Sequence, residues 1–188
     1  MSLNIVIGLS GVGKGTVLEE AMLLSDQEYE VVNYGDKMME TARESHGVEN
    51  RGEMKELDVE TYKGIQADAA EKIFEMAEDS NIIVDTHAAI KSPHGYIPGL
   101  PKWSIEQLEP DKIIMLTAKP EEIWNRVQED DDRDREHESA SGIAEYQHVA
   151  REMASTGSVL TGAYLKVIEN PDGKAERAAE ELVKTLKA

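Results

Sequence analysis

The residues best suited to chemistry lie in segment 8–16, which reads Gly-Leu-Ser-Gly-Val-Gly-Lys-Gly-Thr and follows the apolar run 3–7. Glycines at this density let several backbone N–H groups converge on an oxyanion, and a helix directly behind the loop adds the positive end of its dipole. Lys14 can reach the β- and γ-phosphates as a point charge. The segment therefore predicts a loop that binds the phosphates of a nucleoside triphosphate.

The loop follows the pattern G-x-x-x-x-G-K-[ST] at Gly8, Gly13 and Lys14, but the hydroxyl arrives one place late, at Thr16. The apolar side chains of Val17, Leu18, Ala21, Met22 and Leu24 recur at helical spacing and predict the helix behind the loop. We expect the whole loop to bind the donor nucleotide, through Gly8, Leu9, Ser10, Gly11, Val12, Gly13, Lys14, Gly15 and Thr16.

Asp85 ends another apolar run, 81–85. In parallel sheets ligands bind beyond the carboxyl ends of the strands, and a carboxylate there suits Mg²⁺ held against phosphates. We therefore expect Asp85 and Thr16 to hold Mg²⁺, while a role of Asp85 in capping the next turn stays open. His87 is a candidate for lining the acceptor pocket or for a structural hydrogen bond. The five histidines include no pair at spacing i, i+4, which argues against a zinc site.

Apolar runs that alternate with helical patterns predict an α/β fold with a five-stranded parallel sheet and helices on both faces. Besides 3–7 and 81–85, the strand candidates are 30–34, 112–117 and 164–168. Helices are expected at about 36–45, 59–79 with Asp58 as N-cap, 104–107 opened by a capping box at Ser104, 120–126 and 173–186.

The acidic segment 129–136 interrupts every periodic pattern and carries Arg133 and Arg135. Two arginines at spacing i, i+2 in an extended loop share one side. The segment is either a solvated acidic loop or a lid whose arginines reach the phosphates, and the phosphate loop elsewhere in the chain favours the lid.

The chain has 188 residues, a net charge of −18 and no cysteine. We expect one domain, no disulfide and a cytoplasmic protein. Nucleic-acid binding is disfavoured because no basic stripe is present, and no apolar stretch is long enough for a membrane span. The acid excess is spread along the chain, which favours a halophilic cytoplasm in which salt screens the repulsion. The N-terminus has no basic region before its apolar run, so no signal peptide is expected.

Together, the loop ending in Lys14-Gly15-Thr16, the strand end Asp85-Thr86-His87, the arginine-bearing segment and the five-strand pattern resemble the archaeal type of adenylate kinase. The likeness extends over essentially the whole chain, through segments 32–38, 50–57, 83–87, 95–101, 159–163 and 170–173.

This resemblance implies a three-layer fold like that of the P-loop nucleoside triphosphate hydrolases, with one kinase domain over residues 1–188. It implies an AMP-binding insertion at about 36–80, a short lid at about 128–140 and possible assembly as a homotrimer. The implied reaction is ATP + AMP ⇌ 2 ADP with Mg²⁺. Catalytic roles are implied for Lys14, Arg126, Arg133, Arg135 and Arg151, and AMP contacts for Gly35, Arg51, Met54 and Lys55, with His87 beside them.

Three positions depart from the family pattern: Ser10 replaces a proline, Lys55 an arginine and Asp132 a threonine. Lysine cannot make the bidentate grip of arginine on a phosphate, so Lys55 weakens the expected contact there. A kinase for another nucleoside monophosphate stays open as an alternative. A GTP-dependent switch is disfavoured, because the sequence has neither an Asn-Lys-x-Asp nor an Asp-x-x-Gly motif.

Overall fold

A computed structural model describes residues 1–129 and 139–188 of the chain, without the side chains of Lys55 and Glu129. Its central sheet is five-stranded and parallel, in the order β2-β3-β1-β6-β7. The strands are β1 (Leu3–Ile7), β2 (Glu30–Asn33), β3 (Ile82–Thr86), β6 (Lys112–Thr117) and β7 (Tyr164–Glu169). All five strand predictions are confirmed to within one residue at either end.

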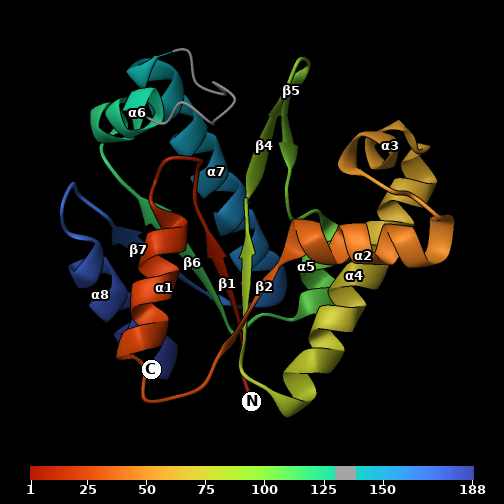
Figure 1. Cartoon of the computed structure of the whole chain (residues 1–188), viewed down its shortest axis with the longest axis horizontal. Helices are drawn as coiled ribbons and strands as arrows, with labels where there is room; N and C mark the ends of the chain where they lie inside the picture. The colour runs from red at the N-terminus through yellow and green to blue at the C-terminus, as the bar shows by residue number, and fades with distance from the viewer. Residues whose placement is uncertain (130–138) are drawn as a thin grey trace.

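Helices cover both faces of this sheet, as expected (Figure 1). Helices α1 and α8 pack against each other on one face, whereas α7 lies on the other with α5 and α4 beside it. The helices are α1 (Lys14–Leu24), α2 (Tyr34–His46), α3 (Arg51–Glu56), α4 (Val59–Asp79), α5 (Lys102–Leu108), α6 (Pro120–Glu129), α7 (Ala140–Thr161) and α8 (Ala175–Lys187).

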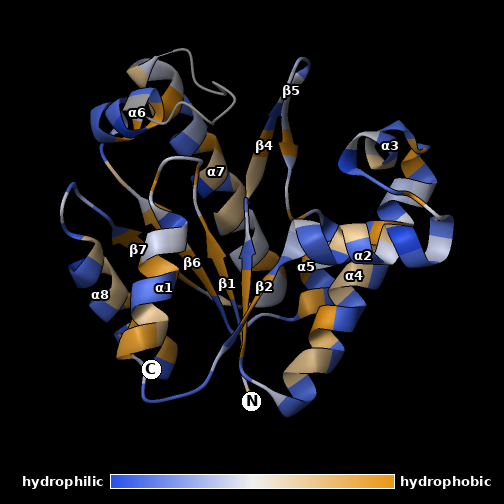
Figure 2. Cartoon of the chain, viewed as in Figure 1, coloured by the Kyte–Doolittle hydropathy of each residue, from blue (hydrophilic) through white to orange (hydrophobic). Residues whose placement is uncertain are grey.

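The core lies between these layers. The hydrophobic strands run through the interior, and hydrophilic residues alternate with hydrophobic ones along the surrounding helices (Figure 2). β1 is buried at every position, as a central parallel strand must be. The expected buried stripe of α8 is confirmed in full, and Asp58 caps α4 by accepting hydrogen bonds from the backbone N–H groups of Glu60 and Thr61. None of the helices in the described ranges has both the length and the apolar character needed to cross a bilayer.

Other expectations were wrong or incomplete. Ser104 does not cap a helix: α5 begins earlier, after Pro101, and the buried Ser104 hydroxyl forms a hydrogen bond with the Tyr34 hydroxyl. Leu24 is exposed at the end of α1 rather than packed in the core. Helix α7 was not predicted, because small residues such as Ala150, Ala154 and Gly157 form much of its buried face and give little hydrophobic signal.

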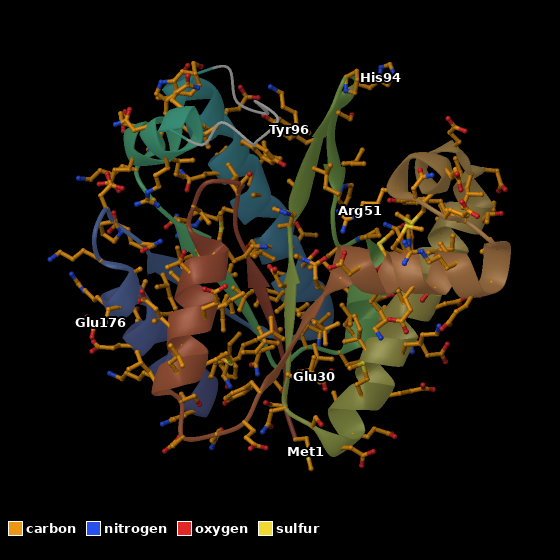
Figure 3. All side chains as sticks on the ribbon, viewed as in Figure 1. Met1, Glu30, Arg51, His94, Tyr96 and Glu176 are labelled. Atoms are coloured by element: carbon orange, nitrogen blue, oxygen red, sulfur yellow. The ribbon has the colours of Figure 1, made fainter. Side chains whose placement is uncertain are left out.

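A two-stranded antiparallel hairpin of β4 (Ala89–Ser92) and β5 (Gly95–Pro98) was also not predicted. It rises from the end of β3 beyond the sheet edge, with His94 at its tip (Figure 3). Tyr96 of this hairpin contacts the ring of Tyr146 in α7 at a centroid distance of 5.2 Å. The Tyr146 hydroxyl donates a hydrogen bond to the Ala89 carbonyl oxygen, so the hairpin is fixed against α7.

Candidate active site

The phosphate loop follows the end of β1 and leads into α1. Gly13 is the N-cap residue of α1 and has a φ of 84°, a left-handed conformation that glycine adopts without strain. A Cβ atom at Gly13 would lie 2.6 Å from Asn170 Nδ2, so a side chain is excluded by space as well. Gly11 shares this φ value and faces Val127. The shape of the turn therefore requires glycine at Gly11 and Gly13, whereas a Cβ atom at Gly15 would meet nothing within 4 Å.

Lys14, the first residue of α1, lies across the loop toward β3. Its ammonium forms an ion pair with Asp85 and donates a hydrogen bond of 2.8 Å to the Thr86 carbonyl oxygen. The sheet register explains this arrangement, since Asp85 is the neighbour of Val6 in β1. Burial lowers the pKa of the Lys14 ammonium, and the adjacent carboxylate opposes that shift. The lysine is thus held beside the loop by contacts within the protein.

The expected magnesium ligands lie on two neighbouring elements. Asp85 is at the carboxyl end of β3, and Thr16 is exposed in the first turn of α1. Within the described residues there is no cluster of three metal-ligating side chains. Mg²⁺ at nucleotide sites is typically held by one or two protein oxygens together with phosphates and water, so a carboxylate and an exposed hydroxyl fit its chemistry.

Behind the loop, two side chains, one after β7 and one from α6, fix the Val12 carbonyl oxygen. It accepts hydrogen bonds from Asn170 Nδ2 at 2.8 Å and from Arg126 Nη1 at 3.2 Å. The Arg126 guanidinium also donates to the Asn170 carbonyl oxygen at 3.0 Å and forms an ion pair of 2.6 Å with Asp172. Arg126 therefore contacts the loop itself.

Sequence reasoning had not assigned a role to Asn170 or Asp172. The signal that could have found them is the segment Asn170-Pro171-Asp172-Gly173, which matched the family pattern without an explanation. Arg151, the next expected arginine, lies at an exposed position of α7 and pairs with none of the described residues. Arg133 and Arg135 lie outside the described residues.

On the acceptor side, the structure brings Gly35 and Arg51 together. A Cβ atom at Gly35 would lie 3.3 Å from Arg51 Nη2, so glycine leaves room for the guanidinium. Arg51 is exposed and forms an ion pair of 2.7 Å with Asp36. Arg51 and Asp36 both border a cavity of about 730 Å³ between α2 and α3. Figure 3 shows Arg51 on the side of the molecule where α2 and α3 lie.

The remaining acceptor candidates have different surroundings. Met54 is buried in the core, and the side chain of Lys55 lies outside what the structure describes. His87 lies at the base of the hairpin, where its Nδ1 is 2.8 Å from the Gly8 carbonyl oxygen. The structural hydrogen bond considered for His87 is thus present, and it joins the start of the hairpin to the start of the phosphate loop.

Comparison with known proteins adds independent findings. A family model described as an AAA domain matches residues 7–144. Two solved shikimate kinases, from Acinetobacter baumannii in complex with shikimate and from Bacteroides thetaiotaomicron, are both 14% identical to this chain. The Acinetobacter structure covers 100% of this chain and 93% of its own chain, at a TM-score of 0.61. The Bacteroides structure covers 100% of this chain and 99% of its own chain, at a TM-score of 0.60. At that identity the likeness shows the fold alone, and it confirms the predicted α/β architecture.

Much closer in sequence are curated archaeal proteins named adenylate kinase. The protein of Methanococcus aeolicus is 42% identical over 98% of this chain and 97% of its own length. The protein of Methanocaldococcus jannaschii is also 42% identical, over 97% of this chain and 97% of its own length. The relative from Methanopyrus kandleri is 44% identical over 98% of this chain and 97% of its own length. With such identity along nearly the entire length, the chain belongs to the adenylate kinase family of archaeal type.

Proposed function

We propose that this kinase transfers the γ-phosphoryl group of ATP reversibly to AMP, giving two ADP. The observation that carries the proposal is the shared position of two sites at one edge of the sheet. The phosphate loop follows β1, and the Gly35–Arg51 region follows β2, with Asp85 of β3 between these strands. The relatives named adenylate kinase support the choice of reaction.

On the donor side, we assign the phosphates of ATP to the backbone N–H groups of residues 8–16 and to Lys14. Its ammonium is oriented by Asp85 and by the Thr86 carbonyl oxygen, so little reorganisation is needed when phosphate arrives. Arg126 and Asn170 act from behind, by holding the Val12 carbonyl oxygen away from the phosphate side of the loop. An electron-rich carbonyl oxygen turned inward would repel the phosphates.

We assign Mg²⁺ to Asp85 and Thr16, in addition to the oxygens of the nucleotide. When bound, the ion would neutralise charge on the phosphates during transfer. Asp85 would then interact with two cations, the Lys14 ammonium and Mg²⁺. A carboxylate permits this because its two oxygens offer about four lone-pair directions.

On the acceptor side, we assign the AMP phosphate to Arg51 beside Gly35, with Met54, Lys55 and His87 in the surrounding region. Arg51 is occupied by the exposed carboxylate of Asp36, and an exposed pair of this kind is weak enough for a phosphate to compete with it. The attacking AMP phosphate oxygen is already an adequate nucleophile. Transfer therefore requires positioning and charge stabilisation rather than a general base.

We further propose that residues 36–80 form the AMP-binding part of a single domain and residues 128–140 its lid. In this assignment Arg133, Arg135 and Arg151 bridge the phosphates during transfer. Closure of a lid over the nucleotides would exclude water, which otherwise hydrolyses ATP.

The decisive experiment is an acceptor screen with ATP, Mg²⁺ and AMP, CMP, UMP or GMP at high salt, with ADP formation as the readout. We expect AMP to be the preferred acceptor. Preference for another monophosphate would replace the substrate assignment while keeping the kinase. Slow GTP hydrolysis without any transfer to AMP would contradict the proposed reaction.

Three properties of the working enzyme belong to the same proposal. We place it in the cytoplasm of a halophile, supported by the net charge of −18 and the absence of cysteine. We also propose a homotrimer, supported by the family resemblance. Light scattering on the purified full chain at high salt measures its mass directly, and a monomer mass would remove the trimer.

A further inference from the structure

Asn33, the last residue of β2, lies between the two proposed nucleotide sites. Its side-chain Oδ1 accepts a hydrogen bond of 3.1 Å from the backbone N–H of Asp36 and so caps α2. Its Nδ2 donates a hydrogen bond of 3.3 Å to Asp85 Oδ2. The sheet register favours this contact, because Asn33 and Asp85 are direct partners in neighbouring parallel strands.

The contact completes a continuous chain of polar interactions across the site. Asp85 presents Oδ2 to Asn33 and Oδ1 to the Lys14 ammonium. In the other direction, Asn33 caps the turn that contains Gly35 and Asp36, and Asp36 pairs with Arg51. The proposed acceptor arginine and the phosphate-loop lysine are therefore joined through four polar contacts.

An asparagine is well suited to this place. Its amide carries an acceptor oxygen and a donor nitrogen on the same carbon atom, so one side chain can cap a helix and hold a carboxylate. Serine and aspartate are equally good N-caps. Neither reproduces the second contact: serine is too short to span both partners, and an ionised aspartate has no donor and places a like charge against Asp85.

We propose that Asn33 is a positioning residue that couples the acceptor site to the donor site. It holds the Asp85 carboxylate, and through it Lys14, in register with the first turn of α2. Nucleotide bound on one side then favours the geometry that the other side requires. The inference rests on the proposed function, since it assumes that AMP binds beside Gly35 and Arg51.

The test measures binding rather than turnover. Calorimetry without Mg²⁺ gives the Kd of AMP, with and without a saturating ATP analogue that has a β,γ-methylene bridge, for wild type, Asn33→Ser and Asn33→Asp. We expect the analogue to tighten AMP binding about fivefold or more in wild type, within the usual range for coupled sites. We expect that factor to fall to within about twofold of one in both variants.

Thermal unfolding separates this role from a merely structural one. Both variants keep a capping oxygen on α2, so the Tm of Asn33→Ser should stay close to that of wild type. Asn33→Asp should have a lower Tm, because its carboxylate repels that of Asp85. Asp58→Ser is the matched control: it exchanges one good cap for another at the start of α4, where, among the described residues, the hydrogen bonds of the Asp58 side chain go to the turn it begins. This control should retain the full coupling factor.

The outcomes are distinguishable. If wild type binds both nucleotides but Asn33→Ser keeps the coupling factor, or if wild type shows no coupling, the role of Asn33 is overturned and the proposed reaction stands. If wild type binds no AMP at any concentration tested, the proposed function fails, and the link to the acceptor site fails with it.

Discussion

Arg126 donates a hydrogen bond from Nη1 to the Val12 carbonyl oxygen at 3.2 Å, joining α6 to the phosphate loop. The same guanidinium is bonded to Asn170 and Asp172, which follow β7. The family resemblance implies a catalytic role for Arg126. The structure adds that its guanidinium contacts the backbone of the loop that we propose binds the phosphates.

From this geometry we expect Arg126→Ala to lower kcat/KM for ATP by about tenfold or more, because a misplaced loop loses several backbone contacts to phosphate together. Arg126→Lys should lower kcat/KM for ATP nearly as much, because a single ammonium cannot reproduce the contacts of the guanidinium with three acceptors. Steady-state kinetics with varied ATP measures both effects. Arg177→Ala, at an exposed position of α8, is the control. A wild-type kcat/KM in Arg126→Lys would contradict the proposal that the guanidinium contacts shape the loop.

The base of the hairpin predicts an effect on stability. A Cβ atom at Gly99 would lie 2.0 Å from the His87 carbonyl oxygen, a backbone atom that cannot move alone. We expect Gly99→Ala to cost about 1–3 kcal/mol in the free energy of unfolding, the usual range for overpacking. Chemical denaturation at high salt provides the measurement.

Gly64→Ala is the matched control for Gly99→Ala. It lies inside α4 with nothing within 4 Å of the added Cβ. Alanine has the higher helix propensity, so this change should stabilise by about 0.5–1 kcal/mol. Equal effects of the two substitutions would mean that the close approach at Gly99 is relieved without cost.

Tyr34, the first residue of α2, predicts a pH-dependent stability. Its buried hydroxyl donates to the Gln66 carbonyl oxygen at 2.7 Å and lies 2.8 Å from Ser104 Oγ. Burial raises the pKa of this phenol well above its usual value of 10.0. We expect Tyr34→Phe to lower the free energy of unfolding by about 1–2 kcal/mol at neutral pH, because buried partners lose a hydrogen bond.

The sign of the pH effect follows from the raised pKa. Above pH 10 the unfolded chain releases the phenol proton while the folded chain retains it, so folding is disfavoured progressively as the pH rises. The stability that this group provides is complete below pH 10, and the difference between wild type and Tyr34→Phe should narrow above it. Tyr164→Phe, 79% exposed, should show neither effect. A constant difference from pH 8 to 11 would contradict the assignment.

For the two arginines of segment 129–136, the sequence predicts a defect in turnover. Arg133→Ala or Arg135→Ala should lower kcat by at least about a hundredfold while ATP binding largely survives, as expected when a contact made in the transition state is lost. Kinetics combined with calorimetric ATP binding separates the two effects. Wild-type kcat in both single variants would refute the role.

Salt dependence tests the origin of the acidic composition. At about 1 M salt the Debye length is only about 3 Å, so repulsion among exposed carboxylates is largely screened. We expect the Tm to rise with KCl concentration and structure to be lost below about 1 M. A Tm that is flat from low to high salt would argue for an ordinary acidic enzyme.

Local patterns were sufficient for the sheet and for the phosphate loop. Buried parallel strands appear as uninterrupted apolar runs, so strands such as 112–117 were predicted with their observed bounds. The loop could be predicted equally well from the sequence, because the roles of Gly13 and Lys14 depend on backbone conformation and on position along the chain. The hairpin and α7 were not predicted, because their stability comes from contacts between segments far apart in the sequence, such as that of Tyr96 with Tyr146.

The sequence by itself determined that a phosphate-binding turn joins a buried strand to a helix, and full-length similarity determined the family. Only the tertiary structure decided what each polar side chain contacts. Lys14 meets Asp85 because β1 and β3 are neighbours, Arg126 meets Val12 across 114 residues, and Asn33 meets Asp85 because their strands share a register. Hydrogen bonds of this kind depend on distances of a few ångströms between distant parts of the chain, which residue types and spacing do not encode locally.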